Sequence, residues 1–306
     1  MSIDREQVRA ARATLALLNP TRNEALRDLL SFFGPVEGLA WLTALDRKPE
    51  KQAEFLHGVS IERLLKYHAA VAELTEHAEA RVLIPEDDDW PARLDDYTRV
   101  AFSAAPSSAL CLWIRGSAGP ANAFRNVVAV TGTRRPSPYG ISVASDLGHG
   151  LIRAGWTVAT GSSVGIDSAA AGGALAAGGP AIAVVPSGLD RPYSYGTNGL
   201  FEQVAERGLL ISAQPPGSTA GASRFTAARQ LLAGLGSGTV VVEATEHSTA
   251  LMVLDETINR GRRATVVPGP ATSATSAGTH AILRDRRSAR LVRHTADVLA
   301  ELSAGR

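Results

Sequence analysis

The sequence predicts an α/β fold, in which a doubly wound, mostly parallel sheet follows a small N-terminal helical domain. Two observations favour this class. From Val127 onward, short apolar runs alternate with stretches whose apolar residues recur every three or four positions, as expected for strands followed by helices. Residues 3–80 contain only the second pattern, so we expect that part to be helical throughout.

The overall composition is that of a globular protein. The chain has 306 residues, of which 45% are hydrophobic and 20% charged, and this length is sufficient for one large or two modest domains. The single cysteine, Cys111, cannot form an internal disulfide. No signal peptide pattern and no apolar run of about 20 residues is present. We therefore expect a cytoplasmic protein without a membrane segment.

The N-terminal helical domain is predicted to span residues 1–80. Breaks at Asn19-Pro20, Gly34-Pro35 and His57-Gly58 divide its leucine pattern into several helices. Residues 1–115 carry 14 Lys or Arg against 18 Asp or Glu, so this part of the chain is acidic. We expect such a domain to pack against the rest of the chain or to bind a partner, rather than to bind DNA.

Residues 81–125 are predicted to form a linker that contains the first strand, near Ala109–Ile114. Glu86-Asp87-Asp88-Asp89 places four carboxylates in this linker. Because these carboxylates are consecutive and are not spaced to converge on a cation, we expect a solvated turn rather than a metal site.

The core is predicted to span residues 126–306 and to form a Rossmann-like sheet. Its first strand, Val127–Val130, leads into Gly132-Thr133-Arg134. Its second strand, Trp156–Ala159, leads into the loop Gly161-Ser162-Ser163-Val164-Gly165. Further strands are expected near Ala181–Val185, Leu209–Ser212, Thr239–Glu243 and Ala264–Val267, with helices between them and a short closing helix at Thr295–Leu302.

Both glycine loops lead from a strand into a helix, at the edge of the sheet where doubly wound folds bind their ligands. Helix N-termini offer free amides and a partial positive charge, and glycine lets a phosphate approach closely. Neither loop has the G-x-G-x-x-G pattern or the P-loop pattern, so no particular nucleotide cofactor is indicated. An alternative is that the glycines only close tight turns.

The second part of the chain is basic. Residues 116–306 carry 17 cationic side chains against 12 acidic ones, and every cation there is an arginine, a residue that suits phosphate recognition. The small, polar stretch Pro268–Thr279 is either a flexible connector or a second wall of hydroxyls and amides for phosphate. These features point to an anionic ligand.

The core resembles one known family in several short motifs that occur in the same order. They are Gly132-Thr133-Arg134 with Tyr139-Gly140, Gly161 with Gly165-Ile166-Asp167, Ser187-Gly188-Leu189-Asp190, Phe225, Val241-Val242-Glu243-Ala244, Gly261-Arg262 and Pro268-Gly269. On these motifs the chain is identified as a member of the DNA-processing protein A (DprA, also called Smf) family, from about Arg81 to about Ile282.

This resemblance implies a protein of DNA processing and recombination that binds single-stranded DNA and, in natural transformation, hands it to the RecA recombinase. It also implies a homodimer, no cofactor and no catalysis by the core. By position, Arg134 pairs with a phosphate or packs on a base, whereas Phe225 either offers a stacking face or belongs to the core. The expected nucleic-acid and phosphate-binding residues are Gly132, Thr133, Arg134, Gly161, Ser162, Ser163, Gly165, Ser187, Gly188, Phe225, Arg229 and Gly269.

The chain departs from the family pattern in several of these passages. Ala171, Ala213 and Thr226 replace a histidine, a glutamate and a proline. Ala228-Arg229-Gln230 replaces Arg-Asn-Arg, and Ser248-Thr249-Ala250 replaces Ser-Gly-Ser. We therefore expect the scaffold of the family with an altered pocket.

Two other functions remain open for the same glycine-loop core, a nucleotide-binding sensor and a nucleotide phosphoribohydrolase. Such hydrolases carry the passage Pro-Gly-Gly-x-Gly-Thr-x-x-Glu, whereas here no acid follows Pro268-Gly269-Pro270 before Asp285. Asp167 and Glu243 are the candidate carboxylates, and both have structural alternatives, since Asp167 can cap its helix. The sequence predicts no catalytic residue and no cluster of metal ligands.

Overall fold

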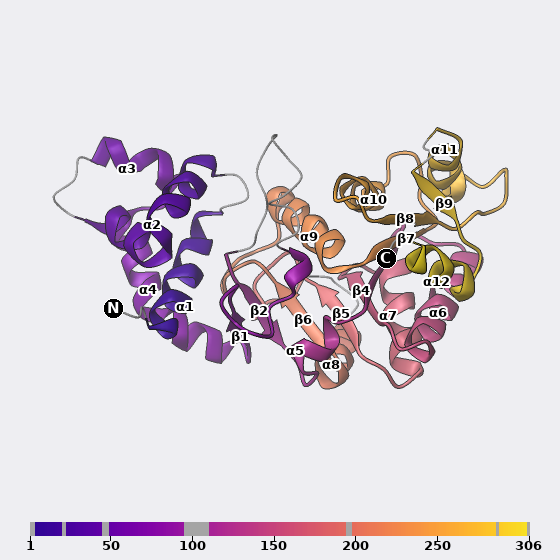
Figure 1. The fold of residues 1–306 in the computed structure, drawn as a ribbon, viewed down its shortest axis with the longest axis horizontal. Coiled ribbons are helices and arrows are strands. Elements are labelled where there is room, and N and C mark those ends of the chain that lie inside the picture. Colours follow the sequence, from indigo (N-terminus) through magenta and orange to yellow (C-terminus); the bar gives the residue numbers. More distant parts are fainter. Residues whose placement is uncertain are drawn as a thin grey trace.

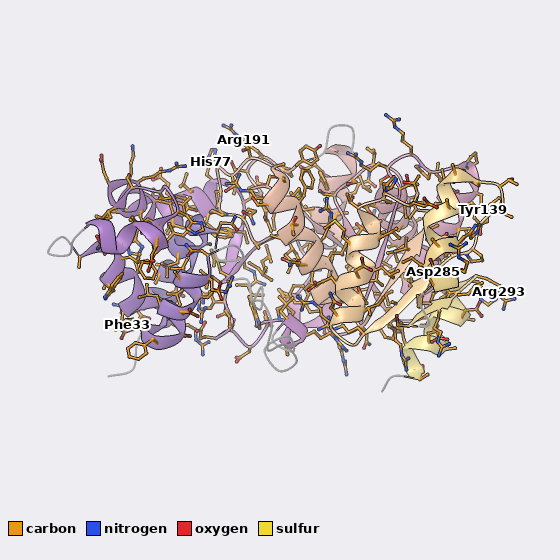
Figure 2. The ribbon with its side chains drawn as sticks, turned by 90° about the horizontal axis from the view of Figure 1, so that it is seen from above. Phe33, His77, Tyr139, Arg191, Asp285 and Arg293 are labelled. Atoms are coloured by element: carbon orange, nitrogen blue, oxygen red, sulfur yellow. The ribbon has the colours of Figure 1, made fainter. Side chains whose placement is uncertain are left out.

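The computed structural model describes residues 4–19, 23–44, 49–94, 110–193, 198–285 and 288–304. A group of helices, α1 to α4, lies at one end of the elongated molecule, and a sheet flanked by further helices forms the rest (Figure 1). The view from above shows the same division, with Phe33 on the helical end and Tyr139 and Arg293 at the opposite end (Figure 2).

The helical part confirms the leucine pattern of residues 3–80. It contains α1 (Arg5–Leu15), α2 (Glu24–Thr43), α3 (Pro49–Leu56) and α4 (Ile61–His77). Asp4, Asn23 and Ser60 begin α1, α2 and α4 as N-caps, each accepting a hydrogen bond from a backbone amide of the first turn. At Gly34 a positive φ of 76° and the following Pro35 kink α2, as the Gly-Pro break predicts.

Within the described residues, nine strands form one sheet in the order β1-β2-β6-β5-β4-β3-β7-β8-β9. The strands from β6 to β9 across this order are all parallel, whereas β1 and β2 are antiparallel to their neighbours. The nine strands are β1 (Arg81–Leu83), β2 (Leu112–Arg115), β3 (Val127–Gly132), β4 (Thr157–Gly161), β5 (Ala181–Val184), β6 (Leu209–Ser212), β7 (Gly238–Val242), β8 (Arg263–Val266) and β9 (Ala289–Leu291).

Helices cover both faces of this sheet, which confirms a doubly wound α/β fold. Val128 and Val130 of β3 pack with α6, α7, α8 and α12 on one face. The alternate residues Val127 and Ala129 pack with α5, α9 and α10 on the other. The helices of this part are α5 (Pro120–Ala123), α6 (Pro138–Arg153), α7 (Ile166–Ala176), α8 (Asn198–Arg207), α9 (Ala222–Leu235), α10 (Ala250–Asn259), α11 (Ala277–Asp285) and α12 (Thr295–Ser303).

The structure adds elements that the sequence patterns did not predict. Strands β1 and β9 have three residues each, too few to show a hydrophobic period. Helix α11 begins at Ala277, inside the stretch Pro268–Thr279 that was interpreted as a loop. The predicted division into residues 1–80, 81–125 and 126–306 stays a prediction, although β1 pairs with β2 and β2 with β6, so that both strands belong to the sheet.

The acidic run after β1 attaches the helical part to the sheet. Arg9 of α1 donates to both carboxylate oxygens of Asp87, with Nη1 2.7 Å from Oδ2, and Arg12 donates to Glu86 at 2.6 Å. The run does form a turn, with Glu86 and Asp88 exposed, but the prediction that its carboxylates are only solvated was wrong for Asp87, whose side chain is largely buried against Arg9 of α1. None of the helices in the described ranges combines the length and apolar character needed to cross a membrane.

Candidate nucleic-acid interface

The point where the strand order reverses lies between β3 and β7. From β3 the chain continues through β4, β5 and β6 on one side, and then returns to β7 on the other side of β3. The carboxyl ends of β3, β4 and β7 therefore meet at one edge, which is where ligands bind in folds of this kind.

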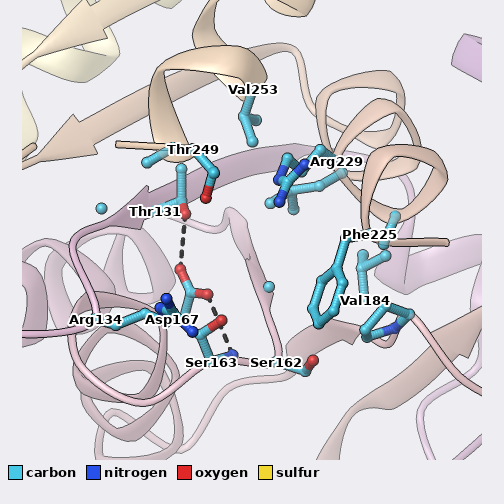
Figure 3. A pocket seen from close by; sticks show the side chains of 16 residues that line it. Thr131, Arg134, Ser162, Ser163, Asp167, Val184, Phe225, Arg229, Thr249 and Val253 are labelled. Atoms are coloured by element: carbon cyan, nitrogen blue, oxygen red, sulfur yellow. Dashed lines mark hydrogen bonds between the residues drawn. The ribbon is translucent and has the colours of Figure 1, made fainter. Parts of the chain in front are cut away.

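A pocket of about 290 Å³ opens at this edge (Figure 3). We call it the arginine pocket. Its wall combines the two glycine loops with the end of β5 and with one side of α9 and of α10. The lining residues are Thr131, Gly132, Arg134, Gly161, Ser162, Ser163, Asp167, Val184, Pro186, Phe225, Ala228, Arg229, Leu232, Thr249, Ala250 and Val253.

The two glycine loops can lie side by side because they lack side chains at the points of closest approach. A Cβ at Gly165 would overlap the backbone at Thr133 and Arg134, and one at Gly132 would overlap the side chain of Ile166, which follows the second loop, as well as the carbonyl oxygen of Val242 in β7. Gly165 also has a φ of 94°, which L side chains rarely adopt. The amide of Ile166 donates to the carbonyl of Thr133 at 3.2 Å, so the second loop supports the first.

Two arginines give the pocket its positive charge. Arg134 is exposed and Arg229 is half-buried, and burial, together with the charge of Arg134, lowers the pKa of Arg229 below its ordinary value. Over the described part of the chain, neither guanidinium forms an ion pair with a carboxylate. Two cations without a partner anion at the mouth of one pocket are suited to a phosphate.

Phe225 forms the aromatic side of the pocket, opposite Arg134 (Figure 3). Its ring contacts Tyr193 edge-on, with 5.1 Å between the centroids, and the guanidinium carbon of Arg229 lies 5.9 Å from its centroid. The side chain is half-buried rather than fully enclosed in the core. Phe225 thus presents an aromatic surface to the pocket beside an arginine.

Asp167 forms the floor of the pocket. It accepts hydrogen bonds from the Thr131 hydroxyl at 2.8 Å and from the Ser163 amide at 3.3 Å, so it joins the end of β3 to the second glycine loop. The N-cap of α7 is Gly165, and Asp167 lies within the first turn of that helix. Burial raises the pKa of Asp167 to about 6, although these hydrogen bonds oppose the shift.

Glu243 lies directly after β7 and forms hydrogen bonds with the loop that follows β3 and the loop that follows β8. Its carboxylate accepts from the Ser137 amide at 2.8 Å, the Ser137 hydroxyl at 2.6 Å and the Thr275 hydroxyl at 2.9 Å. Its carbonyl accepts from the amide of Thr133 at 2.8 Å. The residue is buried with a φ of 51°, a strained conformation for a side chain other than glycine. Glu243 therefore positions the first glycine loop and is not among the residues that line the arginine pocket.

The structure brings together most of the residues that the sequence singled out. The predicted residues that line the arginine pocket are Gly132, Arg134, Gly161, Ser162, Ser163, Phe225 and Arg229. Thr133 lines an adjacent groove, and Gly165 packs beneath the first loop. The departures Ala228, Thr249 and Ala250 also lie in the pocket wall, whereas Ala171, Ala213 and Thr226 are not among the lining residues.

Three predicted residues lie elsewhere. The buried Ser187 hydroxyl donates to the Arg191 carbonyl and accepts from the Tyr193 amide, both at 2.9 Å. Gly188 donates its amide to the Ser218 carbonyl at 2.9 Å. Gly269 packs against Ser276 and is not among the lining residues. These three residues contact nearby loop residues in the structure, and their role in nucleic-acid binding stays a prediction.

The sequence reasoning missed several residues of the pocket wall. Leu232 of α9 and Val253 of α10 line the pocket, but their helical spacing marks them only as buried. Thr131 could have been found, because it lies directly before Gly132 at the end of a strand. A threonine in an otherwise apolar strand is the signal that was overlooked.

A model of the family described as DNA recombination-mediator protein A matches residues 81–303. The chain belongs to this family, the DprA family. The match begins at β1, so α1 to α4 precede the matched region. The chain is also 34% identical over 283 residues to the DNA processing protein DprA of Mycobacterium tuberculosis, a match that covers 90% of this chain and 70% of that protein.

Solved structures of DprA proteins share the fold. The DprA structure from Streptococcus pneumoniae matches with a TM-score of 0.74 and 24% identity over 98% of this chain and 99% of that one. A DprA structure from Helicobacter pylori, described as giving insight into its single-stranded DNA binding mode, matches with a TM-score of 0.62 and 20% identity over 74% of this chain and 98% of that one. The first match includes the helical part as well as the sheet.

Proposed function

We propose that this protein binds single-stranded DNA at the arginine pocket as part of DNA processing. The observation that carries this function is the placement of Arg134 and Arg229, without a carboxylate partner in the described residues, beside the half-exposed ring of Phe225. Arginine pairs with a phosphate, and an aromatic ring stacks on a base whatever its identity. The relative from H. pylori, studied for its binding to single-stranded DNA, supports the same ligand class.

Single strands should bind better than duplexes for a geometric reason. A ring such as Phe225 can stack only on a base that has left the helical stack, and unstacking a paired base costs a few kcal/mol. The pocket of about 290 Å³ is near the lower end of the size range of ligand pockets. We therefore expect it to hold about one nucleotide of the strand at a time.

We further propose that the core binds without turnover. Asp167 and Glu243, the two candidate acids, both accept hydrogen bonds from neighbouring loops, which occupy their oxygens with structural contacts. Across the described ranges, no group of three or more His, Cys, Asp or Glu residues could hold a metal ion. Incubation with nucleoside monophosphates should leave them unchanged, and release of free base would contradict this part.

Delivery of the bound strand to RecA, self-association as a homodimer and a place in the cytoplasm are the remaining parts of the proposed function. They are supported by membership of the DprA family. Co-precipitation with RecA and the mass of the protein in solution test the first two separately from DNA binding.

The direct test is a titration with oligothymidine, duplex DNA and free mononucleotides in the same buffer. We expect the tightest binding for oligothymidine, and we expect its affinity to fall as salt rises, because phosphate contacts release counterions. Equal affinity for the duplex would contradict a base-stacking pocket. Binding of a mononucleotide without any binding of oligothymidine would instead favour a nucleotide sensor.

A further inference from the structure

A second groove lies beside the arginine pocket, on the other side of Arg134. It has a volume of about 830 Å³ and is formed by the loops Gly132–Arg135 and Thr245–Thr249, with Val164 and Thr275. Gly132, Arg134 and Thr249 line both hollows. The two are therefore continuous across the point where the strand order reverses.

The second groove differs in chemistry from the arginine pocket. Its wall contains Arg134, Arg135 and His247, a set of hydroxyl side chains and no aromatic ring. No carboxylate is among its lining residues: Glu243 accepts from Ser137 and Thr275, and Glu246, although it is exposed in the loop Thr245–Thr249, does not line the groove. Arg135 and His247 are exposed, and within the described part of the chain their side chains form no ion pair.

This composition fits a sugar–phosphate backbone better than a base. Cations and hydroxyls contact phosphate and sugar, whereas a base requires a flat apolar or aromatic surface of the kind that only the arginine pocket offers. Because Arg134 lines both hollows, a strand held at the pocket can pass this side chain and continue into the groove.

Given the proposed binding of single-stranded DNA, we infer that the second groove holds the backbone of the nucleotides that follow the one in the arginine pocket, with Arg135 and His247 as its phosphate contacts. A mononucleotide would fill only the arginine pocket. The groove therefore makes binding depend on strand length, and its two exposed side chains contribute only when the strand is long enough to reach them.

The test compares short and long strands on two variants and a control. The Arg135→Ala/His247→Ala double variant removes the groove side chains, and Arg134→Ala removes the shared one. Arg153→Ala is the matched control, because Arg153 is also exposed but lies in the last turn of α6, at the opposite end of the helix that follows the first glycine loop. The short strand is a single nucleotide, thymidine monophosphate, which fills only the arginine pocket, and the long strand is an oligothymidine of about 12 nucleotides, within the range of about 4–16 that single-strand sites cover.

We expect the double variant to bind the long strand about tenfold more weakly and to bind the short strand as the wild type does. Its affinity for the long strand should also depend less steeply on salt, by about 0.7 in the logarithmic slope for each phosphate that the protein no longer neutralises. Unchanged binding of the long strand by the double variant, while Arg134→Ala weakens binding of both strands, would overturn the groove and leave the proposed function standing. Unchanged binding by Arg134→Ala would contradict the proposed function itself.

Discussion

Arg134 lies on the wall shared by the arginine pocket and the second groove, so a single side chain serves both. Its position depends on residues that never face the ligand. The first glycine loop is supported from one side by the amide of Ile166 and from the other by the carbonyl of Glu243. A phosphate that enters the pocket thus meets a guanidinium whose backbone is already in place, and this lowers the entropic cost of binding.

We expect Arg134→Ala to weaken binding of oligothymidine about ten- to a hundredfold, since a hydrogen bond to a charged group contributes about 1.5–3 kcal/mol. Arg153→Ala should change the affinity little, although both side chains are exposed arginines. Fluorescence anisotropy of labelled oligothymidine at fixed salt measures both. Equal and small losses at the two positions would indicate diffuse electrostatic attraction instead of a pocket.

Burying the carboxylate of Asp167 costs free energy of folding, and the size of this cost depends on pH. Its pKa is about 6 in the folded protein and 3.8 in the absence of burial, so the folded state holds the proton more tightly than the unfolded chain. The stabilisation that arises from this raised pKa is fully present below the unfolded pKa of 3.8, and it is lost as the pH rises through about 6.

We therefore expect Asp167→Asn to gain stability relative to the wild type between about pH 4 and about pH 7, by about 3 kcal/mol in the free energy of unfolding. Any hydrogen bond that the amide makes poorly adds a constant that does not change with pH. Urea denaturation of both proteins across this range measures the difference. Parallel curves would show that Asp167 does not titrate as its burial implies.

At the scale of elements, α6 and α7 approach each other closely through glycine. A Cβ at Gly148 of α6 would overlap the carbonyl of Ala170, and one at Gly173 of α7 would overlap the carbonyl of Ser145. The neighbouring Gly172 has open space around its Cβ position. Since the two glycine loops lead into these two helices, the close packing also keeps the loops together.

Gly173→Ala should destabilise the protein and Gly172→Ala should not, although the two positions are adjacent. The first forces the helices apart and should cost about 1–3 kcal/mol in the free energy of unfolding. The second adds a helix-favouring residue in open space and should be neutral or stabilising by up to about 1 kcal/mol. Thermal unfolding of the two variants measures this. An equal loss of stability in both variants would contradict this account, because it would mean that the two helices are no closer at Gly173 than at Gly172.

At the scale of the whole molecule, the helical part is attached to the sheet partly through Arg9 and Asp87, whose side chains are 22% and 13% exposed. Burial by itself raises the pKa of Asp87, but the hydrogen bonds from Arg9 and from the amide of Ile84 outweigh it and bring the pKa below 3.8. This carboxylate therefore contributes stability above its unfolded pKa of 3.8 and loses the contribution as the pH falls through the lowered value.

We expect Arg9→Ala to reduce the free energy of unfolding by about 1–3 kcal/mol at neutral pH, because it leaves a half-buried carboxylate without its main partner. The difference from the wild type should shrink as the pH falls below about 4, where Asp87 becomes protonated. Arg63→Ala, on the exposed side of α4, is the control. Urea denaturation followed by circular dichroism measures all three proteins, and an equal loss at every pH would argue against the ion pair.

Much of the fold could be predicted because buried parallel strands must be nearly continuous apolar runs. Strands β3 to β8 all begin and end within two residues of the predicted positions. Strands β1 and β9 could not be predicted, since three residues carry no period and each strand depends on its neighbour for hydrogen bonds. The N-terminal end of α11 was missed because Ala277-Gly278-Thr279 has the small and polar composition of the loop before it.

The sequence by itself determined the strands β3 to β8, the helical character of the N-terminal part, and that a glycine loop with Arg134 follows the first core strand, because these properties depend on neighbours along the chain. Only the tertiary structure decided that β3 pairs with β7, and that Arg229 of α9 and Thr249, the N-cap of α10, complete a pocket around Arg134. These residues are far apart in sequence and meet through long-range strand pairing. Local periodicity does not encode that pairing, since any apolar strand can pair with several others until the whole core is packed.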